Sequence, residues 1–179
     1  MKTIAHTFKL TLTTALLASC GVIPTPPIAI PDTTIPLTNT AITMGQVVYV
    51  DRDVLGGSTL PAALQGLSIS GNATYAASGG SLSSLKVYVR STLSGLGNTC
   101  TALPTVPATY VCDPAGETAQ AIGTVSVQAG VGRPFTLSGS ALDAAARTGR
   151  GYFGVQITGG NAVQGESLSL KSMTARARL

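Results

Sequence analysis

Short apolar runs with a period of two recur along this chain, and they restrict it to a β-rich fold. In residues 85–90, leucine and valine alternate with charged and aromatic residues, so that one face of the run is apolar. Further strands are expected in residues 46–50, 67–75, 109–112, 123–128, 135–137, 152–158 and 167–172, with the last continuing towards 179. Gly, Ser, Thr and Asn separate the runs at intervals of about 8–15 residues, a spacing typical of β-sandwiches. The sequence therefore predicts an all-β, antiparallel sandwich of about eight strands.

One short helix is expected at residues 141–147. Ser140 is suited to cap its N-terminus, Asp143 lies in its first turn and Arg147 in its last, and Gly149 follows. We expect this helix to close one end of the sandwich or to pack on its edge.

The first 19 residues have the pattern of a secretory signal peptide. Lys2 and Lys9 precede a short apolar run at residues 10–17, which ends in small residues. A membrane-spanning helix requires about 20 apolar residues, and this run is less than half that length.

The residues Leu17-Ala18-Ser19-Cys20 resemble the lipobox of bacterial lipoproteins. This resemblance implies that the signal is removed before Cys20, and that its thiol and new amino group carry fatty acyl chains such as palmitate. It places the protein in the cell envelope, lipid-anchored on the exported side of the cytoplasmic membrane or on an outer membrane. Gly21 is compatible with outer-membrane sorting by resemblance to the rule of enteric bacteria. The alternatives are an ordinary signal peptide with an incidental cysteine, and a leader that is not processed.

Residues 20–44 are expected to form an acylated N-terminus and a Pro/Thr-rich tether to a domain at 45–179. Five of the ten prolines fall here, namely Pro24, Pro26, Pro27, Pro31 and Pro36. Such composition favours extended polyproline conformations. The isoleucines of the segment leave open that part of it lies along the domain as an edge strand.

Cys100 and Cys112 remain as an even pair once Cys20 carries lipid. In an oxidising compartment such a pair predicts a disulfide, which would add on the order of 3 kcal/mol in the chain-entropy model. The alternative is two free thiols. A two-cysteine metal site is disfavoured because the only histidine, His6, lies in the leader.

The same lack of histidine removes Ser-His-Asp and Cys-His catalysis and leaves only oxygen-ligated cations as plausible metals. Asp51 and Asp53 form a weak Ca²⁺ candidate, with a solvated corner balanced by Arg52 as the alternative. Residues 113–117 read as a turn. We therefore expect no catalytic residues and no cofactor apart from the covalent lipid on Cys20.

Tyr88 is the candidate for an exposed ligand contact. By alternation it shares the polar face of residues 85–90 with Lys86 and Arg90. The alternative is a surface tyrosine that completes a sheet face. Nucleic-acid binding is not expected, because outside the leader the nine basic and seven acidic residues give only +2, and the basic residues are scattered except Arg176 and Arg178.

In architecture, residues 45–179 resemble small secreted sandwich modules, immunoglobulin-like or jelly-roll-like, including carbohydrate-binding modules. Such a likeness says little about function. The expected function is a non-enzymatic structural or protein-interaction module that docks an envelope or surface-layer partner. The alternatives are a glycan or small-ligand binding module and, more weakly, a hydrolase that uses paired carboxylates.

Overall fold

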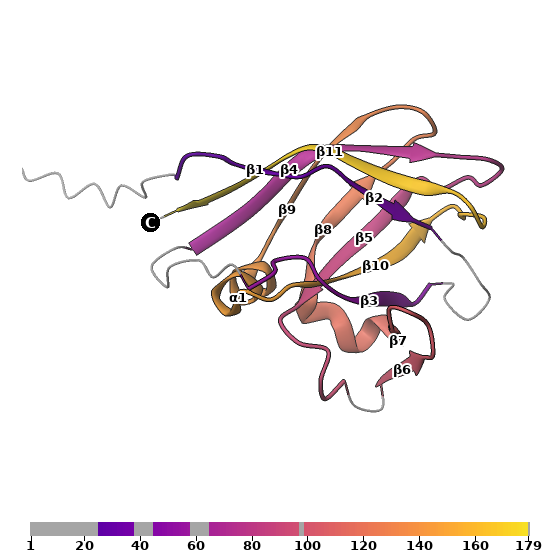
Figure 1. The fold of residues 1–179 in the computed structure, drawn as a ribbon. Coiled ribbons are helices and arrows are strands. Elements are labelled where there is room, and N and C mark those ends of the chain that lie inside the picture. Colours follow the sequence, from indigo (N-terminus) through magenta and orange to yellow (C-terminus); the bar gives the residue numbers. More distant parts are fainter. Residues whose placement is uncertain (1–24, 38–44, 58–64, 97–98, 179) are drawn as a thin grey trace, which may run out of the picture.

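The strands of the protein form two facing antiparallel sheets in the computed structural model, which describes residues 25–37, 45–57, 65–96 and 99–178 (Figure 1). The predicted all-β sandwich is therefore confirmed. The strands in chain order are β1 (Ile28–Ile30), β2 (Thr33–Pro36), β3 (Val47–Asp53), β4 (Gln65–Ala76), β5 (Ser84–Arg90), β6 (Cys100–Leu103), β7 (Thr109–Cys112), β8 (Ala121–Ser126), β9 (Arg133–Ser138), β10 (Tyr152–Gly159) and β11 (Ser167–Arg178).

Sheet A has the strand order β1-β11-β4-β9, with β2 also paired to β11, and sheet B has the order β6-β7-β3-β10-β5-β8. Strands distant in sequence are neighbours in both sheets, so the fold depends on long-range pairing. The short helix α1 (Ser140–Thr148) packs against β4 and β5 at the end of the sandwich where β4 begins (Figure 1).

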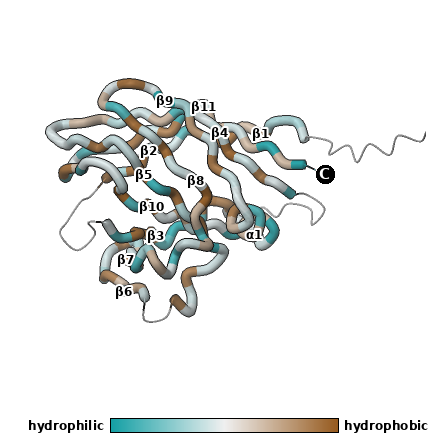
Figure 2. Tube along the Cα trace, turned by 180° about the vertical axis from the view of Figure 1, so that it is seen from behind, coloured by the Kyte–Doolittle hydropathy of each residue, from teal (hydrophilic) through white to brown (hydrophobic). Residues whose placement is uncertain are grey.

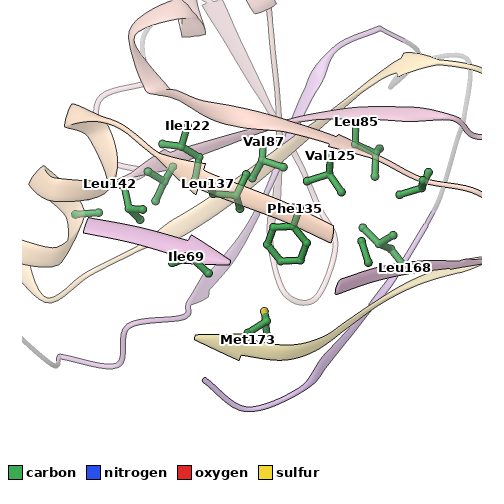
Figure 3. Close-up of a cluster of buried hydrophobic side chains, with 14 of the residues drawn as sticks. Ile69, Leu85, Val87, Ile122, Val125, Phe135, Leu137, Leu142, Leu168 and Met173 are labelled. Atoms are coloured by element: carbon green, nitrogen blue, oxygen red, sulfur yellow. The ribbon is translucent and has the colours of Figure 1, made fainter. Parts of the chain in front are cut away.

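The main hydrophobic core fills the space between the two sheets (Figure 3). Leu85 and Val87 of β5 project into it from sheet B, and Leu168 and Met173 of β11 enter it from sheet A, with Phe135 between them. Burial of each such side chain contributes roughly 1.5–3 kcal/mol. Hydrophobic positions alternate with paler ones along the strands in Figure 2. Leu85, Val87 and Val89 all lie in the main core, which confirms the predicted inward face of residues 85–90.

Two local predictions need correction. Ser140 does not cap α1; Gly139 occupies the N-cap position without a side-chain hydrogen bond, while Gly149 ends the helix in the left-handed region as expected. Residues 113–117, expected as a turn, begin a 3-10 helix, η2 (Pro114–Gln120). Strand β6 had no counterpart among the expected strands.

The N-terminal segment is not a free tether where it is described. Strands β1 and β2 pair with β11 along most of its length, and Leu37 N–H donates to Glu166 O at 2.8 Å. The edge-strand alternative is therefore correct for this part, and a tether spanning all of 20–44 is wrong. Between the two strands, Asp32 Oδ1 accepts a hydrogen bond from Ser172 N–H at 2.9 Å, where β11 bulges. Residues 20–24, including Cys20, and 38–44 lie outside the described residues.

Among the residues that the structure describes, neither helix is long and apolar enough to cross a membrane.

Candidate functional site

A second buried cluster lies on the outer face of sheet B, away from the main core. Residues 91–96 and 99–120, which carry β6, β7 and η2, lie beside β3 (Figure 1). We call this the outer cluster; its buried members are Val47, Tyr49, Tyr88, Leu93 and Cys112. Because of it, the central strands of sheet B are covered on both faces.

Tyr88 lies inside the outer cluster, so the prediction that it is an exposed contact is wrong. Its side chain is only 1% exposed, and its hydroxyl donates to Gln156 Oε1 at 2.6 Å. Burial, followed by the nearby charge of Glu117, raises its pKa. Lys86 Nζ lies 5.5 Å from the centre of the Tyr88 ring and is half-buried. Alternation correctly placed these residues on the outer face of β5, but the outer cluster, which includes Leu93 from the segment after β5, covers that face.

The centre of the site is the carboxylate of Glu117, which is 0% exposed. Arg90 clamps it with two hydrogen bonds, from Nε to Oε2 at 2.8 Å and from Nη2 to Oε1 at 2.6 Å. Tyr49 donates a third, from its hydroxyl to Oε2 at 2.7 Å. A paired guanidinium and carboxylate in this forked geometry form strong charge-assisted bonds, which offset the cost of burying the charge.

Local chain geometry brings Glu117 into this position. Asp113 begins η2 by accepting a hydrogen bond from Ala115 N–H at 2.9 Å, and Pro114 follows in the first turn. The short helix then turns Glu117 inward. From sequence, Glu117 was grouped with the turn, since spacing alone does not show which side chain of a short helix is buried.

Tyr49 is held by a glycine on the neighbouring strand. Gly154 of β10 pairs with Tyr49 of β3, and a Cβ atom at Gly154 would lie 2.5 Å from Tyr49 Cε1. The ring therefore rests directly on the strand backbone. Burial, together with the hydrogen bond to Glu117, raises the pKa of Tyr49 far above its usual range. Arg90 lies 5.8 Å from the ring centre, and its bonds to Glu117 raise its own pKa.

Cys100 and Cys112 border the same cluster, with their sulfur atoms at the disulfide distance of 2.04 Å. They join β6 to β7 directly across the ladder, as the even cysteine pair predicted. Cys100 Sγ lies 3.9 Å from Glu117 Oε1. These three residues form a tight group of potential metal ligands in the described part of the chain. Two sulfurs that are bonded to each other offer no thiolate to a metal.

Glu166 is a second buried carboxylate, directly before β11. It accepts hydrogen bonds from the hydroxyl of Tyr75 and from four backbone N–H groups, those of Ser78, Gly79, Gly80 and Val163, at 2.7–2.9 Å. The carboxylate thereby ties the β4–β5 loop to the β10–β11 loop. Burial opposes its charge, but these bonds outweigh burial and lower its pKa. Burial and the charge of Glu166 raise the pKa of Tyr75 to about 12.

Asp53 stabilises the turn of the chain that follows β3. Its Oδ1 accepts hydrogen bonds from Gly151 N–H at 2.9 Å and Leu55 N–H at 3.0 Å, and the first of these contributes most to lowering its pKa. Asp51 is exposed. In the described ranges, no third acidic, cysteine or histidine side chain joins this pair at metal-ligand spacing. Asp51 and Asp53 stay a weak calcium candidate, beside the alternative of a solvated corner.

A shallow pocket of about 270 Å³ lies where β4 begins and β11 ends. It is lined by Gly66, Ser68, Arg176, Ala177 and Arg178. Both arginines are exposed and flank the buried Ala177. The pocket brings together the one basic pair that stood out in the sequence.

Comparison with known proteins identifies no relative of this chain. No family model matches the chain, and no curated protein or solved structure shows significant similarity to it. The proposals below therefore rest on the sequence motifs and on the geometry of the described residues.

Separate and joint replacement of Arg90 and Glu117 measures their ion pair. We expect Glu117→Met to lower the free energy of unfolding by about 2–4 kcal/mol, because it leaves the Arg90 guanidinium half-buried without its partner. The double variant Arg90→Met/Glu117→Met should lose at least about 1 kcal/mol less than the two single losses combined. Urea unfolding with the disulfide intact gives these values, with Asp51→Asn as a surface control that shifts by no more than about 0.5 kcal/mol. Simple additivity would contradict a direct pair.

Acid titration tests the role of Glu166. Its pKa is lowered in the folded protein, so its stabilisation is complete well above the unfolded value near 4.3 and is lost as pH falls through the folded value. Glu166→Gln should therefore flatten the decline in unfolding free energy below about pH 5. Tyr75→Phe, which removes one donor, should give an intermediate slope. Equal slopes in all three proteins would contradict this assignment.

Proposed function

We propose that this chain is a lipid-anchored cell-envelope protein whose β-sandwich is a non-catalytic structural or protein-interaction module. The anchoring part rests on one observation, the lipobox-like residues 17–20 with their charged and apolar leader. Cys20 would carry the acyl chains and place the sandwich on a membrane surface.

The hydrogen bonds of the two buried carboxylates support a structural role for them, and therefore a non-catalytic module. Glu117 and Glu166 would be the natural candidates for acid–base chemistry in a chain without histidine beyond its leader. Instead, each accepts several hydrogen bonds from groups that hold loops in place. The lowered pKa of Glu166 also makes it a weak base.

Exposed apolar groups near the outer strand of sheet B support an interaction role. Val106, in the β6–β7 loop, is fully exposed, and Val50 of β3 is 39% exposed. Val50 pairs with Thr109 at the start of β7, just after this loop. Strand β6 ends the sheet on this side. An outer strand beside exposed apolar groups is a common place for a partner to pair or pack.

Glycan or small-ligand binding is the less favoured alternative. It depended on an open tyrosine, and Tyr88 is enclosed by the outer cluster. The pocket between β4 and β11 is lined by arginine, serine, alanine and glycine, without the aromatic ring on which a sugar would stack.

Acylation of Cys20 is tested in a bacterium that processes lipoproteins. The mature native protein should begin at Cys20, float with membranes and carry the mass of added acyl chains. Cys20→Ser should keep its leader or leave the membrane fraction, because the modified thiol is gone. Ser19→Ala is the matched control, since it keeps a small residue before Cys20 and should be acylated normally. Native protein without acyl mass would overturn the anchor.

Catalysis is tested by a screen of glycoside, ester and peptide substrates at several pH values. We expect no turnover above that of buffer for the native protein. Turnover that disappears in Asp51→Asn, or in Glu117→Gln at a temperature where that variant is still folded, would show that the module is an enzyme.

A further inference from the structure

The first described residue fixes which end of the sandwich lies next to the anchor. Thr25 N–H donates to Ala177 O at 2.9 Å, and Ala177 N–H donates to Thr25 Oγ1 at 3.0 Å. Five residue steps separate Cys20 from Thr25. At no more than about 3.6 Å per residue, Cys20 lies within about 18 Å of Thr25. A lipid on Cys20 would therefore hold the end of β11 close to the membrane.

That end of the sandwich carries the exposed guanidinium groups of Arg176 and Arg178. They flank the buried Ala177, so both project from the outer face of sheet A. Together with Gly66 and Ser68 they line the shallow pocket. The guanidinium groups of both arginines are therefore accessible to an approaching surface.

Helix α1 places an exposed cation and a hydrogen-bonded acid at the same end. Arg147 is exposed in its last turn, one helical turn beyond Asp143. The carboxylate of Asp143 is engaged by the first residues of β4, accepting from Leu67 N–H at 2.7 Å and Gly66 N–H at 3.1 Å. This acid therefore accepts hydrogen bonds from the strand that lines the pocket.

We propose that the end of the sandwich carrying Arg176 and Arg178 docks on anionic phospholipid headgroups beside the anchor. This inference rests on the proposed acylation of Cys20. Guanidinium groups bind phosphate oxygens in a forked geometry, and each basic residue near an anionic surface strengthens binding on the order of fivefold. The anchor confines the domain to the membrane surface. Binding of the arginines to headgroups then determines which end of the sandwich faces the membrane.

The experiment uses the acylated, full-length processed protein in vesicles of phosphatidylcholine with one quarter phosphatidylglycerol. The chain has no tryptophan, so a single introduced tryptophan reports its own position. Gln65→Trp places it opposite Arg178 at the arginine end, and Ala77→Trp places it in the exposed β4–β5 loop at the far end of β4. A nitroxide on a fraction of the headgroups quenches tryptophan that approaches the surface.

We expect strong quenching at position 65 and weak quenching at position 77. Adding Arg176→Gln and Arg178→Gln should reduce the quenching at 65 to the level at 77. The same loss is expected in pure phosphatidylcholine and at about 0.5 M salt, where charge interactions are screened. The charge-matched control Arg133→Gln/Lys171→Gln should leave the quenching at 65 unchanged, because Arg133 begins β9 at the far end and Lys171 lies midway along β11.

Intact mass and vesicle flotation are measured on every sample, which separates failure of the anchor from failure of the docking surface. Protein without acyl chains would overturn both proposals. Acylated, floating protein with equal quenching at positions 65 and 77 would overturn the orientation and leave the anchor standing. Quenching at 65 that survives removal of both arginines would overturn their headgroup role.

Discussion

The buried carboxylate of Glu117 is stable only because two strands of sheet B supply its hydrogen-bond donors. Arg90 comes from the end of β5, and Tyr49 comes from β3, two strands away in the sheet. Their common target sits on η2, so the bonds hold η2 over the outer face of the sheet. Within the same stretch of chain, the disulfide joins β6 to β7. Without the ion pair, the segment would leave a charge in an apolar cluster, which is costly.

This arrangement explains what could and could not be predicted from the sequence. Alternation in residues 85–90 depends only on neighbours along one strand, and it placed Leu85, Val87 and Val89 in the core correctly. Whether the other face of β5 meets water depends on a segment that begins after the strand ends. Tyr88 was therefore assigned to the right face and the wrong environment. Glu117 and Glu166 could be recognised from sequence only as two acids among seven, since their arginine and tyrosine partners lie 27 to 91 residues away.

The N-terminal segment shows a similar limit. Its prolines suggested an extended chain, and extended backbone is also what an outer strand of a sheet requires. The segment pairs with β11 through β1 and β2, interrupted at Pro31 and Asp32 where β11 itself bulges. Proline has no N–H to offer a further strand, so a proline-rich outer strand both covers the edge of sheet A and discourages additional pairing. Composition alone does not distinguish these uses from a solvated tether.

Pairing of the N-terminal segment also changes what an anchor at Cys20 would do. A free tether of residues 20–44 would let the domain adopt any orientation at a distance from the lipid. A segment that pairs with β11 from Thr25 onwards, through β1 and β2, leaves only a short span between Cys20 and the sandwich. The hydrogen bonds that pair the N-terminal segment with β11 would therefore restrict how the domain can be oriented relative to the membrane. Arg176 and Arg178 would then lie at the end of the module nearest the lipid. The outer cluster belongs to the other sheet, where β6 is the outermost strand and Val106 is exposed.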